Sequence, residues 1–184
     1  MVIPILAILV RCLWIAVEYP YLRRYKVIPQ KDWDKNSAML WDAANLIEPI
    51  GMMFGFTEIG RLHVDKLGEL GVVVLLVGIV IRWTAIHNLG QYFTGTVLIK
   101  NDHTLIRGGL YRYVRHPAYT GTLIAHLGLG LAFSNWISLL FSSIPYALAT
   151  AYRIHVEEQA LRETFDDEYV EYAKQTKRLI PGFF

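Results

Sequence analysis

The sequence predicts an all-α, polytopic integral membrane protein: a bundle of about five transmembrane helices that ends in a helical hairpin. Hydrophobic residues make up 54% of the 184 residues and charged residues 18%, whereas an ordinary soluble domain has about 25% charged residues. Apolar regions approach the roughly 20 residues that a helix needs to cross a bilayer. The basic residues gather in alternate connections, as is typical of a multi-pass membrane protein.

The composition also excludes several classes of protein. The one cysteine, Cys12, rules out a disulfide scaffold. The formal net charge is +2, and no basic run suggests a nucleic-acid partner. Because no HExxH motif and no metal-type spacing of His and Cys is present, we expect no metal site. The length predicts a single domain.

The first expected span is Val2 to Tyr21. We interpret it as a retained helix, because charges lie inside the apolar run and no small-residue cleavage site follows it. Arg11 and Glu18 are seven residues apart and therefore share one helix face. They either face a bundle interior or, in the case of Glu18, lie at the membrane interface.

The second expected span, Ala38 to Phe56, is weaker because it contains Asp42 and Glu48. These acids are either functional or partners for Arg11 or Arg82, and the sequence leaves both possibilities open. Buried charges in a membrane are expected to pair with one another.

The third expected span is Leu70 to Phe93, and the last region contains two. His116 to Tyr152 is a run of 37 residues without a charge. A single helix of that length would measure about 55 Å, too long for a hydrocarbon core of about 30 Å. The chain must therefore turn, and Ser134–Asn135 is the expected turn. The result is a hairpin of Tyr119 to Phe133 and Trp136 to Tyr152.

This arrangement gives the chain an orientation. Of the 18 Lys and Arg residues, 14 fall on one side of the membrane and two on the other, and Arg11 and Arg82 lie within spans. The positive-inside rule then places the N-terminus outside and the C-terminus in the cytoplasm. The single domain 1–184 is expected to consist of three N-terminal spans (1–93), a cytoplasmic connection (94–118), the hairpin (119–152), and a cytoplasmic C-terminal helix and tail (153–184).

Two polar segments flank the hairpin, His103 to Gly121 and Arg153 to Glu158. Because the hairpin leaves the cytoplasmic face and returns to it, we expect both segments to meet in one site. In the first segment, Pro117 suits the first turn of a helix, so His116 would lie at the mouth of the fourth span. Its tyrosines, Tyr111, Tyr113 and Tyr119, offer flat surfaces suited to a nucleoside.

The second segment supplies charges of both signs. Arg153 and Glu157 are four residues apart on one helix face. Arg153 could hold an anionic group with two hydrogen bonds, and Glu157 could accept hydrogen bonds from ribose hydroxyls or an amino group. Taken singly, these residues also fit a simple i,i+4 ion pair, and Arg112 and Arg115 fit interfacial anchors.

The string GLYRYVRHPAYTG, followed by R-x-x-x-E-E, resembles the isoprenylcysteine carboxyl methyltransferase family, whose wider relatives include phospholipid methyltransferases. The resemblance covers roughly His103 to Tyr172. The RHP part alone is shared with integral-membrane sterol reductases. The resemblance implies S-adenosylmethionine as methyl donor, S-adenosylhomocysteine as product, and Arg153 as the catalytic, substrate-binding residue. It implies these cofactor contacts: His103, Thr104, Leu105, Ile106, Tyr111, His116, Pro117, Ala118, Tyr119 and Glu157.

The function expected from the resemblance is methylation of the C-terminal carboxylate of an S-prenylated cysteine. An ionised carboxylate is a nucleophile that needs no general base, so the site has only to position the reactants and exclude water. The alternative is N-methylation of a phospholipid headgroup. An NADPH-dependent membrane reductase and a non-enzymatic lipid-binding protein are less expected. The expected partners are a prenylated cysteine or other lipid-linked acceptor and membrane lipid. The membrane would be the cell membrane of a prokaryote or the endoplasmic reticulum of a eukaryote. The oligomeric state stays open.

Overall fold

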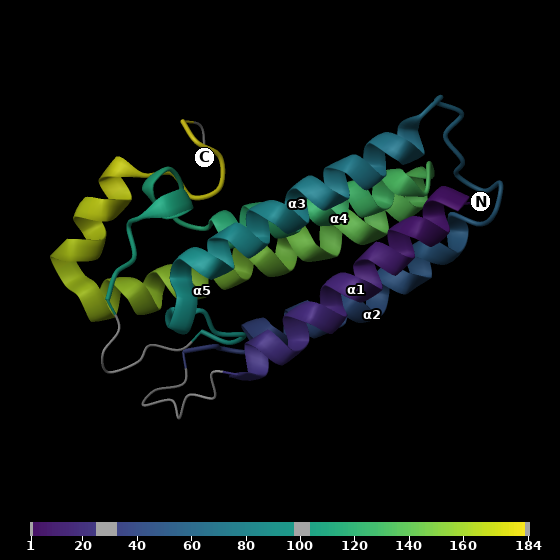
Figure 1. Cartoon of the computed structure of the whole chain (residues 1–184). Coiled ribbons are helices and arrows are strands. Elements are labelled where there is room, and N and C mark those ends of the chain that lie inside the picture. Colours follow the sequence, from purple (N-terminus) through teal and green to yellow (C-terminus); the bar gives the residue numbers. More distant parts are fainter. Residues whose placement is uncertain (1, 25–32, 98–103, 183–184) are drawn as a thin grey trace.

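The computed structural model describes residues 2–24, 33–97 and 104–182, and these residues form an all-helical bundle without a β-strand (Figure 1). The all-α class expected from the sequence is confirmed. Five long helices and two short 3₁₀ turns follow one another as α1 (Val2–Arg24), α2 (Ser37–Phe54), α3 (Leu67–Leu89), η1 (Gly90–Tyr92), η2 (Gly109–Arg112), α4 (Pro117–Ala132) and α5 (Trp136–Gln175).

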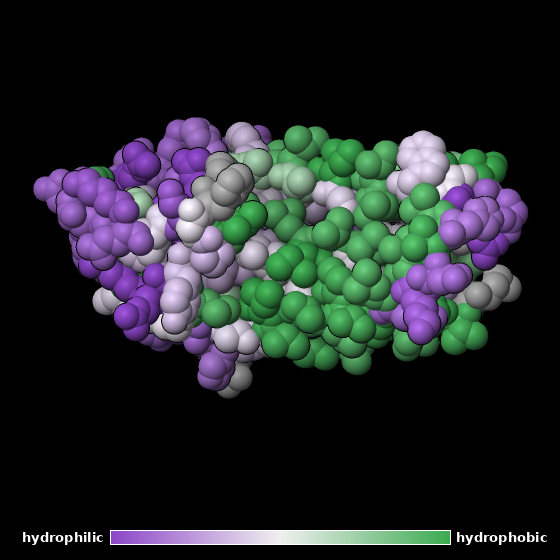
Figure 2. All heavy atoms as spheres, turned by 90° about the horizontal axis from the view of Figure 1, so that it is seen from above, coloured by the Kyte–Doolittle hydropathy of each residue, from purple (hydrophilic) through white to green (hydrophobic). Residues whose placement is uncertain are grey.

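The outer surface of the bundle is apolar along its middle and hydrophilic at both ends, as Figure 2 shows for one face. Two helical segments are long and apolar enough to cross a membrane, Val2–Tyr21 and Leu67–Tyr92. The other three expected spans coincide with α2, α4 and the first half of α5. Because α4 has only 16 residues and a full crossing needs about 20, the crossing of five helices stays a prediction.

The expected hairpin is present, with shifted bounds. Its first arm already begins at Pro117. Proline suits this first helical position because the N–H group that it lacks would have no partner inside the helix there. Its turn falls at Ser134, which adopts a positive φ of 48°, and at Asn135. The Asn135 side chain caps α5 by accepting hydrogen bonds from the backbone N–H groups of Ile137 and Ser138.

The second arm does not end at Tyr152. α5 continues as the expected polar helix to Gln175, because no Pro or Gly interrupts it there. Asp166, with φ 41° and ψ −123°, breaks the helical geometry. The segment beyond this break bends away from the bundle axis (Figure 1). We call residues 167–182 the C-terminal arm.

Close contact between α3 and α4 is made possible by small residues on both helices. A Cβ atom on Gly78 would lie 2.3 Å from the backbone nitrogen of Ala125, and one on Gly128 would lie 2.2 Å from that of Leu75. The backbones therefore approach each other as in the small-residue interfaces of membrane helices. This contact fixes the hairpin against α3 and so positions the polar segments at the end of the bundle.

Replacing Gly78 with leucine is expected to separate α3 from α4, because the new side chain meets backbone atoms that cannot rotate away. We expect a loss of about 3 kcal/mol of unfolding free energy and a fall in melting temperature of about 6–12 °C. Val77→Leu is the matched control, since Val77 is 48% exposed on the same helix. Equal melting temperatures for the two variants would contradict this account.

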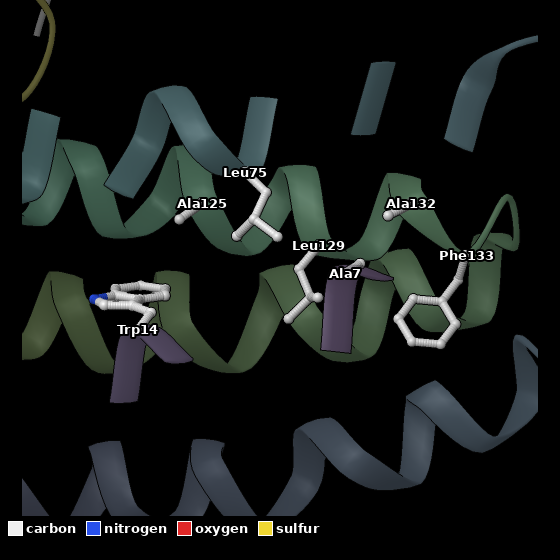
Figure 3. Packing of buried hydrophobic residues seen from close by; sticks show 7 residues of the cluster. All are labelled: Ala7, Trp14, Leu75, Ala125, Leu129, Ala132 and Phe133. Carbon is white, nitrogen blue, oxygen red and sulfur yellow. The ribbon is translucent and has the colours of Figure 1, made fainter. Parts of the chain in front are cut away.

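The largest apolar core cluster lies where α1 meets α3 and α4 (Figure 3). Trp14 on α1 and Leu75 on α3 face the buried side of α4 in this cluster. Its remaining buried members are Ala7, Ala125, Leu129, Ala132 and Phe133. On the other side of the bundle, α2 packs on α5.

Four of the five charged residues within the expected spans face the interior: Arg11, Glu18, Glu48 and Arg82. Glu18 accepts a hydrogen bond of 2.6 Å from the Trp14 indole and forms an ion pair with Arg82. Arg82 also donates to the Thr122 hydroxyl at 2.7 Å. Both charged residues are less than 10% exposed, so Glu18 lies in the bundle interior and not at the interface.

A second buried cluster joins α1, α2 and α4. Glu48 accepts from Arg11 Nε at 3.4 Å and contacts His126 Nδ1 at 2.6 Å. The His126 ring stacks on Tyr146, with centroids 3.4 Å apart. Glu48 is therefore a partner of Arg11, one of the two roles left open by the sequence, whereas Asp42 is exposed on the outer surface of α2.

Candidate active site

A pocket opens at the end of the bundle opposite the N-terminus. Its walls come from the end of α3, η1, residues 93–97, the connection 104–116, the start of α4, α5 and the C-terminal arm. It encloses about 860 Å³, its open mouth included. The same end carries the larger hydrophilic surface in Figure 2.

The pocket brings together most of the side chains that the sequence singled out. Eight of them line it: Leu105, Ile106, Tyr111, His116, Ala118, Tyr119, Arg153 and Glu157. Thr104 is exposed and Pro117 is buried in the first turn of α4, and neither lines the pocket. His103 lies outside the described residues. The roles of all these residues as ligand contacts stay predictions.

Arg153 and Glu157 are linked through a third side chain. The Tyr119 hydroxyl donates to Glu157 Oε2 at 2.7 Å and accepts from Arg153 Nε at 3.1 Å. The His116 ring stacks on the Tyr119 ring, with centroids 5.6 Å apart. The polar segments before and after the hairpin therefore meet in one site, as expected from the topology.

Arg153 is also held by two residues outside the helices, Gly95 after η1 and Asp34 just before α2. Its guanidinium donates to the carbonyl oxygen of Gly95, and its Nη1 lies 3.8 Å from Asp34 Oδ1. Burial would raise the pKa of the Asp34 carboxyl, but hydrogen bonds from the Ser37 hydroxyl and from the N–H groups of Ala38 and Val97 keep that pKa below its usual value. Asp34 is therefore ionised at neutral pH and orients the guanidinium.

Glu158, the second acid of the pair, does not line the pocket but supports its base. It accepts from Arg115 Nε at 3.0 Å and from Arg178 Nη2 at 2.9 Å, and lies 3.4 Å from His116 Nε2. Burial would raise the pKa of the Glu158 carboxyl, but the hydrogen bonds from His116 and Arg178 and the charge of Arg115 hold it well below its usual value. Glu158 is thus a buried anion that fixes three cationic or polar groups.

The C-terminal arm folds over this base. The N–H groups of Arg115 and His116 donate to the carbonyl oxygens of Lys177 and Arg178 at 2.8 and 3.0 Å. The Tyr172 hydroxyl donates to the carbonyl oxygen of Tyr111 at 2.7 Å. The arm thereby places its aromatic side chains on the pocket wall.

The sequence reasoning missed the lining residues of the C-terminal arm and of η1. The break at Asp166 brings Tyr169 and Tyr172 back to the pocket. The polar, acidic sequence around Asp166 instead predicts an uninterrupted helix. Tyr113, expected to offer a flat surface, is 60% exposed and lies outside the pocket. The missed lining residues are Leu89, Tyr92, Phe93, Thr94, Thr96, Val97, Arg115, Ala160, Leu161, Tyr169 and Tyr172.

The Tyr169 hydroxyl indicates that the pocket suits a polar ligand. Tyr169 is 1% exposed, and its buried hydroxyl has no hydrogen-bond partner among the described residues. Burial and the charge of Glu158 raise the pKa of Tyr169, so the hydroxyl remains a donor at neutral pH. A buried donor without an acceptor is unfavourable, and a ligand oxygen or nitrogen in the pocket would satisfy it.

Comparisons with known proteins point to one family. The model of the isoprenylcysteine carboxyl methyltransferase (ICMT) family matches residues 70–163. Protein-S-isoprenylcysteine O-methyltransferase B of Arabidopsis thaliana is 32% identical over 117 residues, which cover 62% of this chain and 59% of the relative. The protein-S-isoprenylcysteine O-methyltransferase of Schizosaccharomyces pombe is 37% identical over 109 residues, 58% of this chain and 46% of the relative.

A solved structure shares the fold. The eukaryotic intramembrane Ras methyltransferase ICMT superposes with a TM-score of 0.62 and 25% identity, over 85% of this chain and 55% of that chain. The chain thus spans between 46% and 59% of the length of these similar proteins. The family match ends before the C-terminal arm, which begins after Asp166.

Proposed function

Because this chain belongs to the isoprenylcysteine carboxyl methyltransferase family, we propose that it transfers a methyl group from S-adenosylmethionine to the C-terminal carboxylate of an S-prenylated cysteine. The observation that carries the proposal is a buried arginine, Arg153, that shares one pocket with a carboxylate, Glu157, and a set of aromatic side chains. A positive group for an anionic acceptor and an acidic, aromatic surface for a nucleoside are the two halves of such a site.

The pocket residues fit the methyl donor. Tyr111 and Tyr119 offer aromatic surfaces, and Glu157, with a side chain 31% exposed, retains lone pairs for ribose hydroxyls or an amino group. The unpartnered Tyr169 hydroxyl supplies a further donor. When bound, S-adenosylmethionine supplies an electrophilic methyl group on a sulfonium. Of the implied contacts in the connection, Leu105 and Ile106 line the same pocket.

Arg153 would act on the acceptor. Its guanidinium is buried, and Tyr119 and Asp34 fix its orientation. An acceptor carboxylate is ionised at neutral pH, so the chain needs no base to activate it. Arg153 would neutralise the carboxylate and align it, and the aromatic walls would reduce the contact of the reactants with water. Both effects favour transfer.

The surroundings of the pocket suit a lipid-linked acceptor. The hydrophilic end of the bundle, where the pocket lies, adjoins an apolar middle on the face that Figure 2 shows. A prenyl chain partitions into lipid by about 0.8 kcal/mol per buried CH₂. The tail would reach the site from the bilayer and the nucleotide from the aqueous side. The excess of Lys and Arg at this end favours the cytoplasmic face.

Binding of the product analogue tests the proposal. Titration of the detergent-purified protein with S-adenosylhomocysteine in a calorimeter is expected to show saturable micromolar binding. Glu157→Ala is expected to abolish it, because that carboxylate is the acceptor on the nucleoside side of the pocket. NADPH is the comparison ligand, and Glu163→Ala, at an exposed position on the same helix, is the matched control. Binding of NADPH alone would overturn the proposal in favour of a reductase.

A further inference from the structure

Two buried hydrogen-bond donors next to Arg153 have no partner among the described residues. One is the indole N–H group of Trp41 on α2, and the other is the hydroxyl of Thr150 on α5. Thr150 is 1% exposed. Buried indole and hydroxyl groups usually find an acceptor, so two orphans in one region need an explanation.

The two donors lie on facing sides of α2 and α5. The Trp41 ring contacts the Arg153 guanidinium, whose central carbon lies 6.0 Å from the ring centroid. The same ring contacts the Tyr146 ring, with centroids 5.8 Å apart. Thr150 lies four residues after Tyr146 and three before Arg153, so these side chains share one face of α5. Tyr146 and Arg153, which lie before and after Thr150 on this face, therefore both contact Trp41.

Trp41 lies directly against two side chains of the pocket wall, Arg153 and Tyr119. Trp41 also contacts the Tyr119 ring, with centroids 6.1 Å apart, and Tyr119 joins Arg153 to Glu157. Trp41 on α2 therefore lies against Arg153, and Thr150 lies three residues before Arg153 on α5. An acceptor held by Arg153 would meet these donors.

We propose that the Trp41 indole N–H and the Thr150 hydroxyl form a subsite for the amide carbonyl oxygen of the methyl acceptor. This inference rests on the proposed function. A cysteine at the end of a peptide has one strong acceptor oxygen besides its carboxylate, the carbonyl of the peptide bond at its nitrogen. With the carboxylate on Arg153, that carbonyl is the group that the two donors can bind. The subsite would select peptide-like acceptors over simple prenylated acids.

Two acceptors separate this role from a general effect on the site. N-acetyl-S-farnesylcysteine carries the amide carbonyl, and S-farnesyl-3-thiopropionate keeps the carboxylate and the prenyl thioether but lacks the amide. Trp41→Phe and Thr150→Val each remove one donor and keep most of the side-chain volume. Trp136→Phe is the matched control, since Trp136 is 49% exposed at the opposite end of the bundle.

We expect each of the two donor variants to raise KM for the amide-containing acceptor by about 3- to 10-fold, the effect of one neutral hydrogen bond. KM for the thiopropionate and the affinity for S-adenosylhomocysteine are expected to stay at wild-type values. Unchanged KM for the amide acceptor, or an equal rise for both acceptors, would overturn the subsite. Wild-type protein that binds S-adenosylhomocysteine but methylates neither acceptor would overturn the proposed acceptor and the subsite with it. Lost cofactor affinity in the donor variants would instead indicate a structural role for Trp41 and Thr150, and would also overturn the inference.

Discussion

Replacing Arg153 with alanine is expected to lower kcat/KM for carboxyl methylation by about 100-fold or more. Removing one member of a buried, hydrogen-bonded charge pair lowers binding affinity by several powers of ten in extreme cases. Arg153 is such a buried residue, with 5% exposure. Without it, the acceptor carboxylate would be desolvated next to Glu157 and Asp34 with no positive charge to balance it. Initial rates with a prenylcysteine acceptor at saturating methyl donor measure this effect.

Two further variants define what Arg153 supplies. Arg153→Lys keeps the charge but loses the planar donors, so we expect an intermediate loss of about 10-fold. Arg162→Ala is the matched control, because Arg162 is exposed on the same helix. Asp34 keeps its hydrogen bonds from Ser37 and Ala38 in the Arg153 variants, so the fold and the affinity for S-adenosylhomocysteine should be preserved. Near-normal carboxyl methylation by Arg153→Ala would refute the assigned role, and an amine acceptor would be much less sensitive to the change.

The meeting of the two polar segments could be predicted because it depends only on hydropathy and chain length. A run of 37 uncharged residues must turn inside the membrane, and a turn brings both of its ends to one face. Arg153, Tyr119 and Glu157 follow from that topology without any knowledge of side-chain packing. The observed link through the Tyr119 hydroxyl adds detail that spacing alone does not contain.

The features that could not be predicted are those that depend on contacts between distant segments. The pairing of Glu18 with Arg82 requires the relative rotation of α1 and α3, which hydropathy does not define. The bend at Asp166 depends on the hydrogen bonds of the C-terminal arm with residues 114–116. Tyr169 and Tyr172 were therefore missed as pocket residues, although the family resemblance extended as far as Tyr172.

Replacing Glu158 with glutamine is the second change for which we expect a large effect, because Glu158 joins α5 to the C-terminal arm through Arg178. Adjacent acids in the sequence look equivalent, but Glu157 lines the pocket and Glu158 is 4% exposed among Arg115, His116 and Arg178. Glu158→Gln keeps the size of the side chain and removes its charge. It leaves the buried Arg115 without its counter-ion, which typically costs roughly 3–5 kcal/mol. We expect a fall in melting temperature of about 10 °C and a loss of S-adenosylhomocysteine binding, because the arm that carries Tyr169 would detach.

The pH dependence of this stabilisation has a defined sign. The pKa of Glu158 is lowered in the folded protein, so its contribution is fully present above the ordinary carboxyl pKa of about 4.3 and is lost only as the pH falls toward the lowered value. The difference between wild type and Glu158→Gln should therefore be constant at neutral pH and shrink only in acid. Glu171→Gln is the matched control, because Glu171 pairs with Lys174 on the exposed face of the C-terminal arm. A Glu158→Gln protein that melts with the control, or that keeps its affinity for S-adenosylhomocysteine, would show that the arm does not hold the pocket together.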